Sequence, residues 1–228
     1  MLNNMHLALI TTTYTILKKD LKSEMRNRYV VNSLLMFIIV TISIIRFAIG
    51  DEKVEPEILS GLLWIVIFFS ASSGLSRVFI KEEEKETTYA LKLSVDPISV
   101  LLGKLLFNGV LTFSLNIVII SLFILITGFV ITSIPAFIII VVLGNLGIIA
   151  SSTIIAAIIA KANTKGTLYP VLAFPVLMPL LITVINSTKL ASTGSPIQDF
   201  LPDMQILLSY AIVVITASLL LFKFIWED

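Results

Sequence analysis

The side chains that most often perform chemistry are scarce in this chain. The sequence has no Cys and one His, His6, which excludes thiol nucleophiles, Cys-ligated zinc, a CxxCH haem attachment and the paired histidines of an HExxH zinc site. The string SASSG, from Ser70 to Gly74, offers hydroxyls without a neighbouring His, and we interpret it as a close helix-packing face. No GxxxxGK[ST] phosphate loop is present, so ATP cannot be bound in the P-loop manner. We therefore expect a chain that is not an enzyme, with any ATP hydrolysis in a partner chain.

The most informative polar segment runs from residue 81 to residue 97. An acidic run precedes a short helix-like pattern with Leu91 and Leu93, and Asp96 with Pro97 then marks a turn. We interpret the segment as a docking helix that offers acids and apolar side chains to a soluble partner; a solvated connection is the alternative. The predicted docking residues are Glu82, Glu83, Glu84, Glu86, Leu91, Asp96 and Pro97.

Uncharged polar residues and prolines lie within apolar stretches. Hydrogen bonding between helices is the simpler interpretation of Asn108, Asn116 and Asn145, and lining a translocation pathway is the alternative. Pro175 and Pro179 each remove an amide donor and disfavour a straight helix. A bend used in transport and an ordinary proline-containing membrane helix are both compatible with these prolines.

These residues belong to a chain too apolar for a water-soluble protein. It is 57% hydrophobic and 14% charged, whereas soluble chains are about 45–50% apolar and roughly 25% charged. Six apolar stretches reach or approach spanning length. They are residues 29–49, 58–78, 105–131, 136–160, 167–185 and 204–225. We therefore predict an all-α integral membrane protein with six transmembrane helices, in which residues 1–228 form one domain.

Residues 5–28 are too polar to span a membrane. Apolar residues recur there at helical spacing and the second half is basic, a pattern typical of an amphipathic helix that lies at the interface and binds membrane lipid. Arg46 and Lys104 stand near the ends of spans, where long side chains can extend to the membrane surface. The net charge of +1 predicts no nucleic-acid partner.

The distribution of Lys and Arg predicts the orientation. With the N-terminus in the cytosol, five basic residues precede the first span, and only three lie on the opposite side, Arg46, Lys53 and Lys189. The other basic residues on the cytosolic side are Arg77, Lys81, Lys85, Lys92, Lys104, Lys161, Lys165 and Lys223. The positive-inside rule therefore predicts both termini in the cytosol.

Two blocks of sequence carry a family resemblance. GLLWIVIFFSASSGLSRVF, the acidic segment and LLGKLLFN with Lys104 form the first, and IIAKANTKGTLYPVLAFPVLMPLLITV forms the second. In this order they resemble the haem exporter protein B (CcmB) family, ABC-type permeases of cytochrome c maturation. The resemblance implies a subunit in the bacterial cytoplasmic (inner) membrane that works with a separate ABC ATPase subunit and haem-handling membrane partners.

The resemblance also implies that haem is a transported or handled ligand of the complex. We assign no cofactor, metal or haem ligand to this chain itself, and a second copy of the chain is a further candidate partner. Two other functions fit the same plan. One is an ABC exporter permease for a lipid, drug or polysaccharide, and the other is a non-transporting scaffold for the ATPase.

Overall fold

The computed structural model describes residues 2–26, 28–80, 82, 88–161 and 168–227. In these ranges the regular structure is helical, without strands. The helices are α1 (Leu2–Arg26), α2 (Arg28–Ile49), α3 (Pro56–Leu75), α5 (Thr88–Ser94), α6 (Pro97–Thr127), α7 (Ile134–Lys161), α8 (Tyr169–Thr193) and α9 (Ile197–Glu227).

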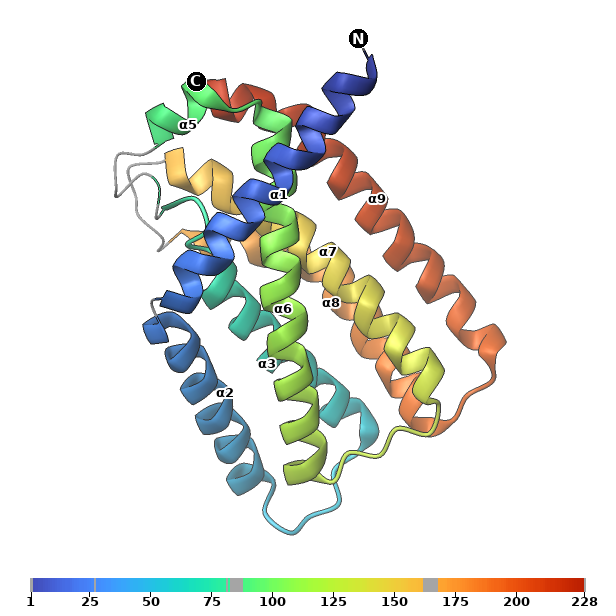
Figure 1. Cartoon of the computed structure of the whole chain (residues 1–228). Coiled ribbons are helices and arrows are strands. Elements are labelled where there is room, and N and C mark those ends of the chain that lie inside the picture. Colours follow the sequence, from blue (N-terminus) through green and yellow to red (C-terminus); the bar gives the residue numbers. More distant parts are fainter. Residues whose placement is uncertain (1, 27, 81, 83–87, 162–167, 228) are drawn as a thin grey trace.

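Within this described part of the chain, six helices are long and apolar enough to cross a membrane, namely α2, α3, α6, α7, α8 and most of α9. The predicted all-α membrane fold is therefore confirmed. Figure 1 shows both termini and α5 at one end of the bundle, which we call the terminal end. The connections from α2 to α3, from α6 to α7 and from α8 to α9 lie at the opposite end.

Three helices extend well beyond their predicted spans, and one of them, α9, begins at Ile197 rather than at residue 204. The prediction started the third span at residue 105, but α6 begins at Pro97, because the Asp96 side chain caps the helix by accepting a hydrogen bond from the Ile98 amide at 3.0 Å. The prediction ended the fifth span at residue 185, but α8 continues to Thr193 and stops at Gly194, whose φ of 76° suits glycine. Hydropathy marks where lipid begins, whereas capping residues decide where a helix begins and ends.

The centre of the bundle depends on close helix contacts. α7 packs against α6, α8 and α9, and α3 packs against α8 and α6. A Cβ added at Gly144 of α7 would lie 2.6 Å from the Trp64 ring and 2.8 Å from Val184, so a larger residue would separate α7 from α3 and α8. The indole of Trp64 also donates to the Thr188 hydroxyl at 2.8 Å, which satisfies its buried N–H.

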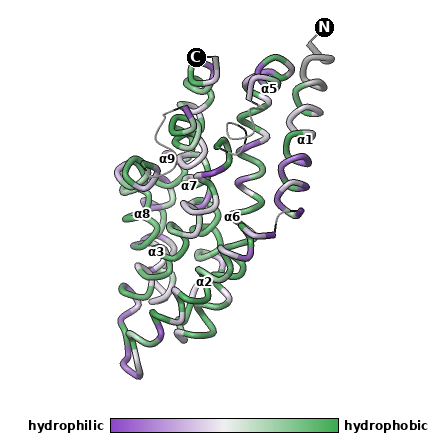
Figure 2. The backbone as a smooth tube through the Cα atoms, turned by 90° about the vertical axis from the view of Figure 1, so that its left-hand side faces the viewer, coloured by the Kyte–Doolittle hydropathy of each residue, from purple (hydrophilic) through white to green (hydrophobic). Residues whose placement is uncertain are grey.

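The predicted amphipathic N-terminal segment forms one helix, and α1 crosses the front of α6 (Figure 1). A Cβ added at Gly103 of α6 would lie 2.7 Å from the Ile16 side chain of α1, so the two backbones approach closely. Figure 2 shows polar residues concentrated in the part of α1 that leads into α2. Because Ile10, Tyr14 and Met25 remain exposed, α1 packs on the bundle and still offers apolar side chains to its surroundings.

Candidate functional site

A buried lysine organises the terminal end. Lys104 is only 2% exposed, and its Nζ atom lies 2.9 Å from Glu82 Oε1 and 2.9 Å from Asp20 Oδ2. The same amine donates to the backbone oxygen of Val78 at 3.0 Å. The expectation that Lys104 extends to the membrane surface is therefore wrong, because two carboxylates within the chain neutralise it where it is buried.

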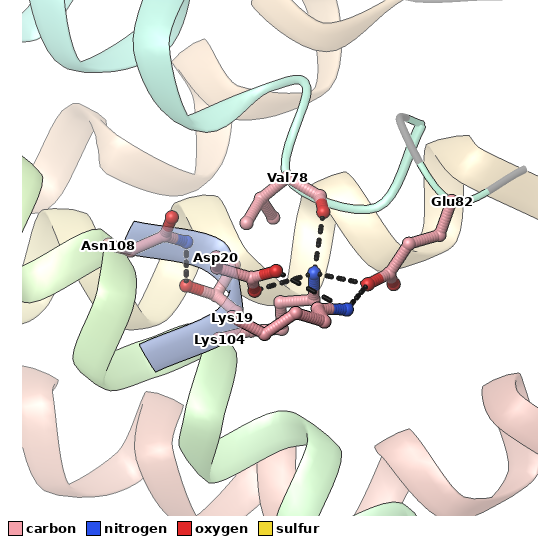
Figure 3. A network of polar contacts seen from close by, with 7 residues as sticks. Lys19, Asp20, Val78, Glu82, Lys104 and Asn108 are labelled. Carbon is pink, nitrogen blue, oxygen red and sulfur yellow. Dashed lines mark hydrogen bonds and ion pairs between the residues drawn. The ribbon is translucent and has the colours of Figure 1, made fainter. Parts of the chain in front are cut away.

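A second lysine completes this group, which we call the Lys104 network: Lys19, Asp20, Glu82 and Lys104. Nζ of Lys19 lies 2.5 Å from Glu82 Oε1 and 3.3 Å from Asp20 Oδ1. Figure 3 shows the two amines and the two carboxylates converging from α1, α6 and the segment after α3. Paired charges of opposite sign therefore join three parts of the chain.

The pKa values of the groups outside the spans reflect this pairing. Burial raises the pKa of Glu82, but the charge of Lys104 and the hydrogen bonds from both lysines outweigh burial and hold that pKa below its ordinary value of 4.5. Burial lowers the pKa of Lys19, but the hydrogen bond to Glu82 and its charge outweigh burial and raise that pKa above 10.5. Both side chains are therefore charged at neutral pH.

The predicted docking residues differ in burial and in what they contact. Glu83, Glu84 and Glu86 lie outside the described residues. Glu82 is buried in the Lys104 network, so its carboxylate faces the interior of the chain and not a partner. Asp96 is exposed and caps α6, and Pro97 is the first residue of that helix.

The predicted short helix is present as α5. Leu91 is half-buried and packs against the core. Tyr89 and Leu93 are 75% and 91% exposed, which makes them the strongest apolar contacts that α5 offers to another molecule. The prediction named Leu91 as a docking residue and left out Leu93, but Leu91 faces the core and Leu93 faces outward. A helix of seven residues has too little periodicity for the sequence to separate the two.

The three asparagines join α6 to α7. The Asn108 amide donates to the Thr153 hydroxyl at 2.8 Å, and the Asn116 amide donates to the Asn145 oxygen at 2.6 Å. Asn145 in turn donates to the backbone oxygen of Val141. These bonds are the interhelical type that polar groups at membrane depth commonly form.

The proline-containing helix α8 is continuous through Pro175 and Pro179, so the prolines do not break it. Between them, the backbone oxygen of Val176 accepts a hydrogen bond from the Tyr210 hydroxyl of α9 at 2.8 Å. The same hydroxyl lies 2.9 Å from Ser151 Oγ of α7. Tyr210 therefore links three helices, a role that sequence reasoning missed because an isolated Tyr in an apolar stretch gives no signal for it.

In the residues that the structure describes, no three His, Cys, Asp or Glu side chains are grouped to hold a metal ion.

The six long apolar helices define a multi-pass α-helical membrane protein. A family model described as CcmB protein matches residues 11–225, and the chain belongs to the CcmB family. This confirms the resemblance seen in the sequence. A comparison with curated proteins gave no match. The family is the permease subunit of the haem exporter in cytochrome c maturation and works with an ABC ATPase.

Proposed function

We propose that this chain converts the motion of a separate ABC ATPase into movement of its own helices, and that α5 is the main contact with the ATPase. The observation that carries the proposal is the pair of exposed side chains Tyr89 and Leu93. Aromatic and aliphatic side chains that project from a short helix suit a groove on a soluble partner. Of the acids predicted for docking, the exposed Asp96 would add charge near this contact. Glu83, Glu84 and Glu86, which lie outside the described residues, remain proposed docking residues from the sequence alone.

A force on α5 has short routes into the bundle. Only Val95 and Asp96 separate α5 from α6, and the Asp96 cap fixes the start of α6. On the other side, Glu82 contacts Lys104 of α6 and Lys19 of α1. Motion of α5 would therefore reach α6 directly and, through the Lys104 network, α1.

The decisive experiment compares Leu93→Asp with Met25→Asp in the complex that contains the ATPase. Met25 is 75% exposed near the junction of α1 and α2, so it controls for placing a charge on an exposed apolar side chain outside α5. We expect Leu93→Asp to reduce co-purification of the ATPase and haem-dependent ATP hydrolysis, because burying an unpaired carboxylate is costly. Full association and activity in Leu93→Asp, or equal loss in Met25→Asp, would move the docking site away from α5.

We further propose that the protein lies in the bacterial cytoplasmic membrane with both termini in the cytosol. The excess of basic residues on one side supports this orientation, as does the location of both termini at one end of the bundle (Figure 1). Haem is proposed as a ligand that the complex transports or handles, without a haem ligand in this chain. Haem-handling membrane subunits and a second copy of the chain are the proposed membrane partners.

A further inference from the structure

A cavity of about 400 Å³ lies beside the Lys104 network. It is partly open, and it is lined by α1, the start of α2, the end of α3 with the segment after it, α5 and the first half of α6. Charged side chains form one part of its wall, and Val30, Phe107 and Leu111 contribute an apolar part. A ligand that fills this cavity must therefore combine a charged group with an apolar body.

The wall holds three basic side chains, Lys19, Arg77 and Lys104, and three carboxylates, so a ligand can use only a charged group that the chain itself does not pair. The carboxylates on the wall are Asp20, Glu24 and Glu82. Asp20 and Glu82 are paired with Lys19 and Lys104, and Glu24 has an interaction of its own. Arg77 is exposed on the same wall and makes no ion pair or hydrogen bond among the described residues.

Arg77 also lies at the depth in the membrane where lipid headgroups are expected. It follows the end of α3 at Leu75, where the chain leaves the membrane-spanning helix. Phe107 and Leu111 lie further along α6 toward the membrane interior. The cavity therefore changes from charged to apolar in the same direction as the membrane changes from headgroups to acyl chains.

The apolar end of the cavity is narrow. A Cβ added at Gly74 would lie 3.3 Å from Leu111 Cδ2 and 3.3 Å from Leu34 Cδ1, so α2, α3 and α6 come together there. The space suits a headgroup with its glycerol and the first acyl carbons, and the rest of each chain would leave where the cavity is open. A free phosphate ion would leave the apolar wall without a contact.

We propose that this cavity is a specific site for an anionic glycerophospholipid. The planar guanidinium of Arg77 binds the phosphodiester, for which its paired donors are well suited. Val30, Phe107 and Leu111 contact the glycerol and the start of the acyl chains. The bound lipid fills the space between α1 and the bundle, so it stabilises the position of α1 against α6. This proposal does not depend on the substrate of the complex or on contact with the ATPase.

The test is a titration of the full chain, purified in dodecyl maltoside, with phosphatidylglycerol while Tm is measured. We expect Tm to rise with lipid concentration and then saturate. Arg77→Gln should weaken the apparent affinity about tenfold or more, since hydrogen bonds to charged groups contribute about 1.5–3 kcal/mol. Arg28→Gln is the matched control, because Arg28 is exposed at the start of α2 and does not line the cavity.

A second pair of variants tests the cavity without removing charge. Leu111→Trp should fill the apolar end and abolish the lipid-dependent rise in Tm. Val110→Trp, at an exposed position of α6 outside the cavity wall, should preserve it. The Tm of each variant without added lipid shows whether it is folded. If a variant of one pair fails to fold, the other pair alone tests the proposal.

Three results would overturn the proposal. Arg77→Gln could bind as tightly as the unaltered chain, or Arg28→Gln could weaken binding equally, which would indicate general attraction to basic residues. Diacylglycerol with the same acyl chains could raise Tm as much, which would exclude recognition of the phosphate. Glycerol 3-phosphate alone could give the full rise, which would identify a soluble phosphate compound as the ligand.

Discussion

Nζ of Lys104 lies 2.9 Å from a carboxylate oxygen of Asp20, so a helix that crosses the front of the bundle is joined to a membrane-spanning helix by a buried ion pair. Lys104 is almost fully enclosed, and its contacts with Asp20, Glu82 and Val78 replace those it would make in water. A buried charge is tolerated only when its partners are in place. The position of α1 therefore depends on the Lys104 network.

Removing the charge at Lys104 should destabilise the protein strongly. We expect Lys104→Met to lower the free energy of unfolding by about 3–5 kcal/mol, because Asp20 and Glu82 would keep buried charge without their main partner. The matched control is Lys189→Met, which breaks the exposed pair with Glu57 at 2.5 Å and should cost about 0–1 kcal/mol. Thermal unfolding in detergent measures both. Equal changes in the two variants would contradict a structural role for the Lys104 network.

Stability should fall on the acid side because of Glu82. Its pKa in the folded chain is below the ordinary 4.5, so its contribution is complete above pH 4.5 and is lost as the pH falls through the lower, folded value. Lys19, whose pKa is raised above 10.5, contributes until the pH rises through its folded value. Tm measured from pH 7 down to pH 3 should therefore decline below pH 4.5.

The control for this pH dependence is Glu82→Gln, which cannot titrate. It should have a lower Tm at neutral pH and a shallower decline in acid, because one carboxylate with a lowered pKa has been removed. An acid decline as steep as that of the unaltered chain would assign the pH dependence to other groups.

The sequence was sufficient to predict the membrane-spanning helices but not the contacts between them. Spans are predictable because a helix in lipid needs a long apolar stretch, and α2 begins and ends within one residue of its predicted limits, 29–49. Lys104 was misjudged because hydropathy treats a lysine near a span end as a surface residue. Its partners Asp20 and Glu82 come from separate segments that only the folded chain brings together.

The candidate site was likewise only partly predictable from the sequence. The acidic run and the leucines pointed to residues 81–97, because acids between two spans run against the basic trend of that side. They could not show that Glu82 turns inward while Leu93 points outward. That choice depends on Lys19 and Lys104, whose positions are set by the packing of α1 on α6 at Gly103. Asp20 is an acid within a basic amphipathic segment, and this was the feature of the sequence that could have indicated an ion pair with a lysine elsewhere in the chain.

Tyr210 should hold α8 in its observed position without being needed for membrane insertion. Tyr210→Phe removes the hydrogen bonds to Val176 and Ser151 and should lower the free energy of unfolding by about 1–2 kcal/mol. Tyr29→Phe is the control, because that ring is exposed at the start of α2. The amount of protein in the membrane fraction and Tm together check the prediction. A Tm unchanged by Tyr210→Phe would show that the α7–α8–α9 contact is maintained by packing alone.

The orientation can be tested directly, because the chain contains no cysteine and each introduced thiol is therefore a single reporter. Leu93→Cys places a thiol at a side chain of α5 that is 91% exposed, at the terminal end. Lys53→Cys places one in the exposed connection between α2 and α3 at the opposite end. A membrane-impermeant maleimide added to intact bacterial spheroplasts should label Lys53→Cys and leave Leu93→Cys unmodified until the membrane is opened. The reverse pattern would place α5 on the outer side of the membrane, where an ATPase in the cytosol could not reach Tyr89 and Leu93. Both the predicted topology and the proposed contact with the ATPase would then be wrong.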